Sequence, residues 1–294
     1  MPAAITLDDL RTALTLTPAG AHPRGHLLTG GGQAHPSDRV FGGLLLAQAV
    51  MAAGQASPPG LLPVSLQADF LVGVPAGRPI TWLVEDLGTL TSFATRRMTA
   101  LGDGEAPLFT ATVRLTRDRA DLPSYSLVER WKVPGPEGLT DLYGRYGEDE
   151  RIPPWWRLRR PVDIRHTEPP SYLAPEQPPT HRQTVWWRVA EDLGEYDDLF
   201  AAAVTAYTSD MSVIEPVFRQ SGASRHLDGS RILSLTHNLV LHRVPRLEAW
   251  MQMDCEVAAL SHGRARGTAE IHGPEGHLAS FTQLALVKLG GRPA

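Results

Sequence analysis

One carboxylate in this sequence stands where a buried helix would not favour a charge. Residues 198–218 read DLFAAAVTAYTSDMSVIEPVF, and their apolar side chains recur at steps of three and four, the spacing of one helix face. These side chains are Phe200, Ala203, Val204, Tyr207, Met211, Ile214 and Phe218. Asp210 falls on the same face. Because a carboxylate among apolar groups loses hydration, its pKa rises, and Asp210 is predicted to accept a proton near neutral pH. The alternative is a structural Asp that caps a turn or pairs with an arginine.

Two further polar side chains interrupt apolar stretches of the second half. Ser234 lies between Leu233 and Leu235, and Gln283 precedes Leu284 in LASFTQLALVKLG. A strand serine often satisfies only a neighbouring backbone group, and a buried amide needs partners whatever its role. Together with Asp210, however, the pair offers a base, a hydroxyl and an amide, which are the groups needed to hold and activate a water.

The composition excludes several classes of protein. The 294 residues carry a formal net charge of -4 without a basic block, which argues against nucleic-acid binding. The single Cys255 allows no internal disulfide and no cysteine-based zinc site, and the 11 histidines show no ligand spacing. No apolar run of membrane-spanning length and no signal pattern occurs. We therefore expect a cytoplasmic protein with no membrane span, no metal and no cofactor.

Hydrophobic periodicity predicts the same order of elements twice, a helix and then four strands. In the first half, a short helix is expected within 5–16, a strand within 25–32 and a nearly all-round buried helix within 39–55. In the second half, two strands separated by a proline-rich loop precede the helix that contains Asp210. The eight strands that follow the helices are expected at 63–72, 79–88, 92–101, 106–116, 231–243, 248–260, 263–273 and 278–290.

A constant offset supports an internal repeat. Ser65 and Ser234 are 169 positions apart (234 minus 65). The same separation relates Leu66 to Leu235, Ser92 to Ser261, Arg97 to Arg266, Thr99 to Thr268, Ala100 to Ala269 and Gly104 to Gly273. Gly42 and Asp210 are 168 apart (210 minus 42), so the two long helices are expected to correspond after a one-residue slip. At these offsets the first half has Gly42, Ser65 and Arg114 in place of Asp210, Ser234 and Gln283, so only the second half carries the polar set.

The periodic pattern is lost between the two halves. We predict an N-terminal module at 1–118, a connection at 119–152 rich in charge, glycine and proline, and a C-terminal module at 153–294 that carries the polar set. The last module begins with PPWWRLRR, residues 153–160. We interpret this cluster as packed aromatic rings beside solvated arginines, with an interface or a phosphate contact as the alternative.

Several segments resemble the double-hotdog acyl-CoA thioesterases, the thioesterase II family. They are RVFGGLLLAQAV and LQADFLVGVPAGRPITWLVEDLGTLTSFATRRMTA in the first half, and TSDMSVIEPV, SLTHNLVLHR and ASFTQLAL in the second. The resemblance covers about residues 25–290. It implies an α+β chain of two fused hotdog modules, each a long helix wrapped by a curved antiparallel sheet. It also implies one catalytic site per chain and the hydrolysis of acyl-CoA to a free fatty acid and CoA.

The resemblance also assigns roles to residues. The family site is an Asp, a Ser or Thr, and a Gln that hold the attacking water; these fall on Asp210, Ser234 and Gln283. The chemistry, independently of the resemblance, requires backbone donors for the substrate carbonyl; Gly42 and Gly43 of a neighbouring module, at the expected helix start, are candidates for binding it through their N–H groups. Gln67 in QADF stands where the family often has a His in an HSYF-like sequence, so a role in substrate binding is expected there too.

Other chemistries fit the residues less well. No G-x-S-x-G nucleophile elbow is present, and Cys255 is interpreted as a core thiol, which leaves an activated water as the nucleophile. A hotdog enoyl- or hydroxyacyl-CoA hydratase would use His237, but strand alternation predicts that His237 faces away from Ser234. A non-catalytic acyl-CoA-binding module is the other alternative. We expect a homo-oligomer, and the acyl chain is left open.

Overall fold

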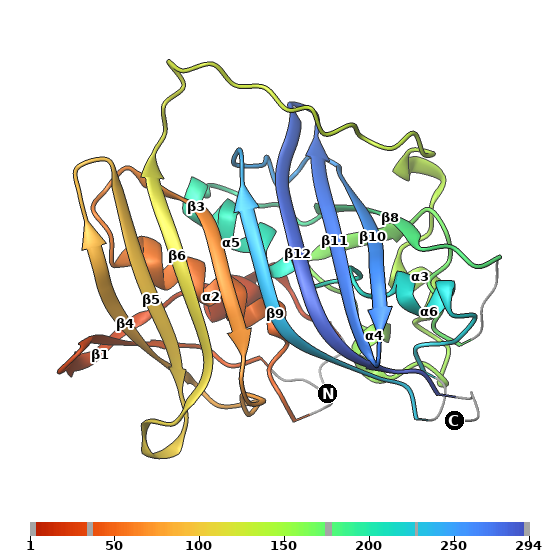
Figure 1. The fold of residues 1–294 in the computed structure, drawn as a ribbon, viewed down its shortest axis with the longest axis horizontal. Coiled ribbons are helices and arrows are strands. Elements are labelled where there is room, and N and C mark those ends of the chain that lie inside the picture. The colour runs from red at the N-terminus through yellow and green to blue at the C-terminus, as the bar shows by residue number, and fades with distance from the viewer. Residues whose placement is uncertain (1–3, 34–37, 174–177, 227–228, 291–294) are drawn as a thin grey trace.

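A single antiparallel sheet organises the chain. The computed structural model describes residues 4–33, 38–173, 178–226 and 229–290. Among these residues, twelve strands form one sheet in the order β1-β2-β4-β5-β6-β3-β9-β12-β11-β10-β8-β7. Figure 1 shows the sheet curving around helices α2 and α5, which lie against the same face. The expected α+β class and the curved antiparallel sheet around buried helices are therefore confirmed.

The first half of the chain contains three helices and six strands. They are α1 (Leu7–Leu14), β1 (Thr17–His22), β2 (Gly25–Gly30), α2 (Gly42–Gln55), β3 (Leu61–Phe70), β4 (Ile80–Thr89), β5 (Phe93–Leu101), η1 (Asp103–Glu105) and β6 (Pro107–Arg117). Every strand expected here is present, and β1 is an additional one. Exposed side chains dominate β1, so its sequence lacks the apolar alternation from which a strand can be predicted.

The second half repeats the four-strand run and adds two strands at the far edge. Its elements are η2 (Pro136–Gly138), α3 (Leu142–Tyr146), α4 (Pro154–Arg157), β7 (Val162–His166), β8 (Arg182–Val189), α5 (Asp198–Ser209), α6 (Pro216–Gln220), β9 (Arg231–Leu241), β10 (Met251–Ser261), β11 (Arg264–Gly273) and β12 (Gly276–Lys288). In the described part of the chain, no helix combines the length and the apolar character that crossing a membrane requires.

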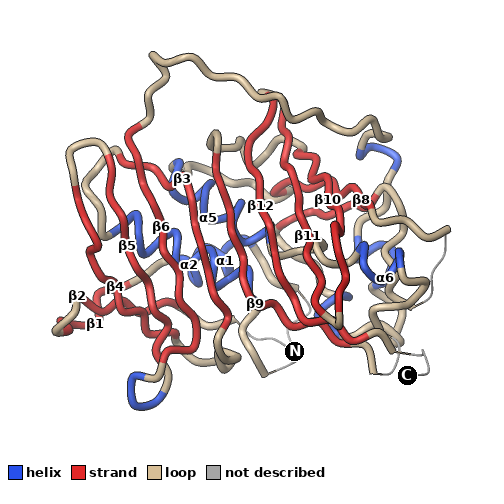
Figure 2. Tube along the Cα trace, in the orientation of Figure 1, coloured by secondary structure: helices blue, strands red, loops and turns tan. Residues whose placement is uncertain are grey.

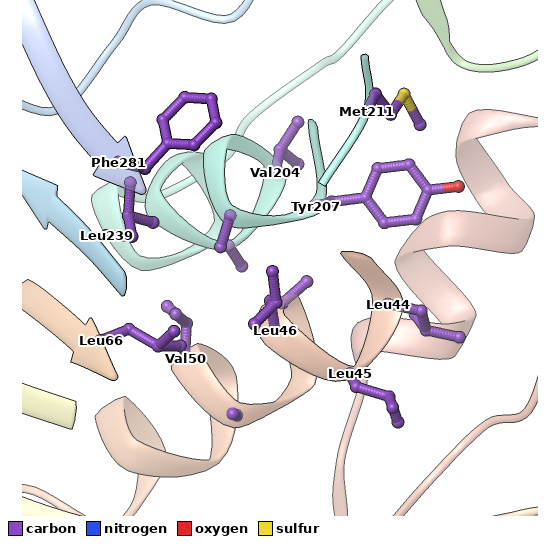
Figure 3. Packing of buried hydrophobic residues seen from close by; sticks show 14 of the residues in the cluster. Leu44, Leu45, Leu46, Val50, Leu66, Val204, Tyr207, Met211, Leu239 and Phe281 are labelled. Atoms are coloured by element: carbon purple, nitrogen blue, oxygen red, sulfur yellow. The ribbon is translucent and has the colours of Figure 1, made fainter. Parts of the chain in front are cut away.

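The core lies between the sheet and the two central helices. Figure 3 shows side chains of α2 and α5 meeting those of the sheet. The labelled residues, all nearly or fully buried, are Leu44, Leu45, Leu46, Val50, Leu66, Val204, Tyr207, Met211, Leu239 and Phe281. Burying one such leucine contributes about 2 kcal/mol. Both helices are therefore held by packing on almost every side, as the sequence predicts for α2 and as α5 also shows.

The two halves of the sheet join through β3 and β9, and this joint reveals the repeat. Ala68 pairs with His237 in the antiparallel ladder, and these residues are 169 positions apart (237 minus 68). When a twofold axis relates two antiparallel strands, the two residues that face each other at the axis must occupy the same position in the two repeats. The ladder meets that condition at the offset predicted from the sequence, so the β3–β9 joint is pseudo-symmetric.

Other parts of the predicted repeat are wrong. At the offset of 168, α5 maps onto residues 30–41, whose described members form no helix. The helix before Asp210 therefore has no counterpart there. Gln283 pairs with His237 and Gly267, whereas Ala111 pairs with Ala68 and Met98. The first-half counterpart of Gln283 is thus Ala111 instead of Arg114, because the β12 register has shifted by three residues.

The helix predicted over 198–218 is interrupted. α5 ends at Ser209, with Asp210 as its C-cap, and the chain restarts as α6 at Pro216. Between them Ser212 adopts a left-handed φ of 66°. Proline has no N–H to continue the helical hydrogen bonds and disfavours helix in the residue before it. Asp210 therefore lies at a helix end rather than within a helix face.

The connection after β6 is an extended loop. Figures 1 and 2 show it running along one end of the sheet from β6 toward α3. Residues 121–130 are all exposed. Its attachment is polar: the Trp131 N–H donates to Asp254 Oδ2 at 3.0 Å, and Arg130 Nε donates to Gln252 Oε1 at 2.6 Å. The loop therefore lies on the sheet surface without contributing to the core.

Candidate active site

Asp210 lies where two helix ends meet. It caps the C-terminus of α5 and accepts a hydrogen bond from the Gly43 N–H in the first turn of α2. The C-terminal end of a helix carries a partial negative charge and the N-terminal end a partial positive charge. α5 therefore disfavours ionisation of the carboxyl group, whereas α2 favours it.

The glycine pair at the start of α2 makes this approach possible. A Cβ atom on Gly42 would lie 2.5 Å from Asp210 Oδ2, and one on Gly43 would lie 2.2 Å from the Tyr207 carbonyl oxygen. Real Cβ atoms do not come this close, so alanine at Gly42 would push the Asp210 carboxylate aside and alanine at Gly43 would press on the Tyr207 backbone. The structure thus brings Gly42 and Gly43 to Asp210. Their expected role in binding the substrate carbonyl stays a prediction.

Gln283 joins the other two predicted site residues. From β12 its Nε2 donates to Asp210 Oδ1 at 2.9 Å and to Ser234 Oγ, on β9, at 2.6 Å. The Gln283 side chain is 2% exposed, whereas Asp210 and Ser234 are partly exposed. The two amide hydrogens therefore go to two acceptors, and the acceptors remain accessible from one side.

The pKa of Asp210 is raised to about 7. Loss of hydration on burial is the main cause, and the hydrogen bonds from Gln283 and the Gly43 N–H, together with the positive charge of Arg225, oppose it. A carboxyl group with a pKa near neutrality can both remove and return a proton. The direction predicted from the sequence is therefore confirmed.

The three residues open onto a cavity of about 760 Å³. Phe41, Trp155 and Trp156 form an aromatic part of its wall, and Arg225 and His226 belong to a polar part. Further lining residues are Arg39, Val40, Gly42, Pro153, Ser212, Val213, Ile214, Glu215, Ser230, Arg231, Ile232 and Leu233. The site thus combines an apolar and a charged surface.

The basic and aromatic cluster at 153–160 lies at this wall. Trp155 is 2% exposed, so the packed aromatic ring predicted there is confirmed. The Arg160 guanidinium stacks on the rings of both Trp155 and Trp156, at 4.6 and 5.0 Å. Its Nε and Nη1 atoms are buried, so the prediction of solvated arginines is wrong for this residue.

A buried ionic group beside Asp210 was missed in the sequence. The Glu215 carboxylate lies 3.7 Å from His166 Nε2 and 3.8 Å from Arg225 Nη1, and Glu215 is 4% exposed. Glu215 directly precedes α6, so this group fixes the turn that follows Asp210. His166 lies 49 positions before Glu215 (215 minus 166) and Arg225 lies 10 positions after it (225 minus 215), and no spacing rule could have joined them. Within the described ranges, no three His, Cys, Asp or Glu side chains lie close enough to hold a metal ion.

Neither Gln67 nor His237 is among the residues that line this cavity. Gln67 is exposed on β3 and does not line the cavity; its role in binding stays a prediction. The prediction that His237 faces away from Ser234 is wrong. Ser234 pairs with Ala285 and Thr236 with Leu284, so Leu235 is an extra residue in β9. A β-bulge of this kind inverts the alternation, and both His237 and Ser234 reach Gln283.

The chain is similar to acyl-CoA thioesterases in its family match and in its sequence. The acyl-CoA thioesterase N-terminal domain matches residues 32–116, and the acyl-CoA thioesterase C-terminal domain matches residues 134–287. Human acyl-coenzyme A thioesterase 8 is 27% identical over 276 residues, covering 87% of this chain and 84% of that protein. The two domain matches lie side by side along the chain, and the relative covers most of it.

Two solved structures share the fold. A TesB protein of Mycobacterium avium subspecies paratuberculosis superposes with a TM-score of 0.77 at 22% identity, covering 96% of this chain and 99% of that one. A hot-dog-fold protein of Alicyclobacillus acidocaldarius superposes with a TM-score of 0.75 at 20% identity, covering 97% of this chain and 98% of that one. The expected pair of hotdog modules is therefore confirmed as the fold.

Proposed function

The chain belongs to the acyl-CoA thioesterase family, and from this premise we propose that it hydrolyses acyl-CoA with a water held by Asp210, Ser234 and Gln283. The supporting observation is the Gln283 amide, which donates to both other side chains at 2.9 and 2.6 Å. A carboxylate and a hydroxyl fixed side by side at the edge of a cavity provide the acceptors and the donor that one water needs.

The reaction follows from these groups. Asp210 removes a proton from the water while the water oxygen attacks the thioester carbonyl carbon. A tetrahedral oxyanion forms, and the carbon–sulfur bond then breaks. The proton held by Asp210 goes to the leaving thiolate, which releases CoA and a free fatty acid and returns the carboxylate. A pKa of about 7 suits both proton transfers, because neither direction is strongly uphill at neutral pH.

The oxyanion needs hydrogen-bond donors. Gly42 begins α2, and the first N–H groups of a helix have no partner within the helix. We propose that the Gly42 N–H, adjacent to the Gly43 N–H that donates to Asp210, donates a hydrogen bond to the carbonyl oxygen of the substrate. The Phe41, Trp155 and Trp156 rings lining the cavity would contact the apolar part of the substrate.

The alternatives have weaker support. A hydratase would need His237 to exchange protons with substrate, but His237 is fully buried and does not line the cavity. Burial lowers the pKa of His237 to about 4, which keeps the ring neutral. A non-catalytic acyl-CoA-binding module would not need a carboxyl group with a pKa near neutrality.

Asp210→Asn is the direct test. Release of thiol from palmitoyl-CoA should fall on the order of 100-fold to 10,000-fold in kcat, because the base is lost while its shape is kept. Asp198→Asn is the matched control, since it removes an exposed carboxylate at the other end of the same helix. Unchanged turnover in Asp210→Asn would refute the mechanism, and addition of water to an enoyl-CoA without thiol release would identify a hydratase.

Broader properties remain proposals. The substrate is an acyl-CoA, and thiol release from acyl-CoAs of graded length would identify the preferred chain. We also propose a cytoplasmic location and a homo-oligomer. Light scattering of the purified chain would measure its mass in solution, and a monomeric mass would contradict the second proposal.

A further inference from the structure

His237 lies directly behind the amide that holds the two cavity-facing groups. It pairs with Gln283 across the β9–β12 ladder, is fully buried and does not line the cavity formed by the described residues. Its ring stacks on Phe281 at 5.4 Å with an angle of 23° between the planes. The ring is therefore held in one orientation, with each nitrogen facing one polar side chain.

Those two contacts specify the hydrogen bonds available to the ring. Nδ1 lies 3.4 Å from Gln283 Oε1, and Nε2 lies 3.0 Å from Ser209 Oγ. A neutral imidazole has one N–H and one acceptor nitrogen. The Ser209 hydroxyl has one hydrogen and two acceptors within reach, Nε2 and the Ala206 carbonyl oxygen at 2.8 Å. Ser209 can therefore serve either tautomer.

The Gln283 amide, in the orientation observed, can form a hydrogen bond with only one tautomer of His237. When Nδ1 carries the hydrogen, it donates to Oε1, and the amide N–H groups point at Asp210 and Ser234. When Nε2 carries the hydrogen, two acceptors face each other at Nδ1 and Oε1. The amide would then turn over and place its oxygen against the Asp210 carboxylate, which is repulsive whenever that carboxylate is ionised. The tautomer of His237 thus determines which end of the amide reaches Asp210.

We propose that His237 is a positioning residue, whose Nδ1–H holds the Gln283 carbonyl so that the amide N–H groups point to Asp210 and Ser234. This inference rests on the proposed function only for its effect on turnover. The bulge at Leu235 makes this arrangement possible, since it brings Ser234 and His237 to one face of β9 so that both contact Gln283.

Nitrogen NMR of the histidine rings tests the tautomer without any assay of activity. The spectrum separates a protonated from an unprotonated ring nitrogen, and His237→Asn identifies the signals of this ring by their loss. The expected result is a hydrogen on Nδ1 and a free electron pair on Nε2. A hydrogen on Nε2 in the wild-type protein would overturn the proposal.

Two substitutions then test the effect on turnover. His237→Leu removes the donor at similar volume and should lower kcat on the order of 10-fold to 100-fold, with KM changed much less. His237→Asn keeps an N–H near the Nδ1 position and should recover most of that loss. Asn238→Leu is the matched control, because Asn238 is the next residue of β9 and is exposed on the other face.

The outcomes separate this inference from the proposed function. Equal loss in His237→Asn and His237→Leu would refute positioning through the donor and indicate a packing role. Full turnover in His237→Leu would refute it as well. Should the wild-type protein release no thiol from any acyl-CoA, the proposed function fails, while the NMR result still decides the tautomer. If His237→Leu does not fold, the Asn variant and the NMR result decide the matter.

Discussion

Arg225 lines the same cavity as Asp210. Burial raises the pKa of Asp210 to about 7, and the positive charge of Arg225 opposes that rise together with the hydrogen bonds from Gln283 and the Gly43 N–H. Because the base acts as a carboxylate, turnover should rise as pH increases through about 7. Arg225→Gln removes the charge, so the pKa of Asp210 rises further and the acidic limb of the kcat profile moves to higher pH. The variant should therefore lose more activity at pH 6 than at pH 8.

Arg225→Lys is the matched variant for that shift. It keeps the positive charge but loses the planar stack on Trp156, which lies 4.7 Å from the guanidinium. The acidic limb should therefore stay near its wild-type position in Arg225→Lys. A limb that moves equally in both variants would indicate that packing, and not charge, determines the pKa of Asp210.

The site residues show how far a sequence can predict chemistry. Asp210 was identifiable because a carboxylate among apolar residues must shift its pKa, whereas Ser234 and Gln283 were assigned their roles through the resemblance to the thioesterase II family. His237 was missed because alternation assumes a regular strand, and one extra residue at Leu235 reverses it. A bulge depends on tertiary pairing, which local sequence does not specify.

At the scale of elements, the N-terminus of α2 is the most constrained part of the site. In Gly42→Ala the new Cβ atom would lie 2.5 Å from Asp210 Oδ2 and 2.9 Å from the Phe70 ring. The carboxylate end can turn away, so the fold should survive while kcat falls by at least about tenfold. In Gly43→Ala the clash is with the Tyr207 backbone, which cannot turn, so stability should fall by about 1–3 kcal/mol.

Denaturant unfolding and thiol release measure these two effects. Gly54→Ala is the control in the last turn of α2, because there the added Cβ atom would meet only the flexible end of Leu199. It should change stability less than Gly43→Ala. Wild-type turnover in Gly42→Ala would show that the Asp210 carboxylate tolerates the added Cβ atom. Glycine at position 42 would then not be required to position that carboxylate.

Strands were the elements predicted best. Each of the eight long strands alternates apolar and polar residues or forms a buried apolar run, and each was observed within a few residues. The end of the helix that begins at Asp198 and its correspondence with the first long helix were predicted poorly. The apolar spacing continues through Met211 and Ile214 although the helix does not, since both residues are buried in the turn as well. The spacing of apolar residues indicates which side chains are buried, but it does not indicate whether the backbone between them is helical.

At the scale of the whole molecule, the two halves should stay together when the connection is cut. β3 pairs with β9, and α2 packs against α5, so the core crosses the boundary between modules. The boundaries 1–118, 119–152 and 153–294 remain a prediction. A specific protease site inserted after Leu127, which is 87% exposed, should be cut readily. The fragments should then co-elute in size-exclusion chromatography and keep releasing thiol, with the uncut insertion variant as control.

Separation of the fragments after cleavage would contradict this expectation. It would mean that the covalent connection, and not the shared sheet, holds the halves together. That outcome is not expected, because the joint between β3 and β9 includes the fully packed Leu66 and Leu239.

The Asp210 carboxylate should also reduce the stability of the whole fold above neutral pH. The pKa of Asp210 is about 7 in the folded chain and about 3.9 in an unfolded chain. Because the pKa is higher in the folded chain, the protonated carboxyl group stabilises the fold. This stabilisation is fully present below the unfolded-state pKa and is lost as pH rises through 7. At pH 8 the ionised carboxylate therefore costs up to about 4 kcal/mol of unfolding free energy.

Asp210→Asn resembles the protonated form at every pH, so it should be more stable than the wild-type protein at pH 8. The advantage should shrink steadily between pH 7 and pH 4, and denaturant unfolding of both proteins across that range measures it. A stability difference that does not change with pH would show that Asp210 titrates normally, and the case for it as the base would fail with that result.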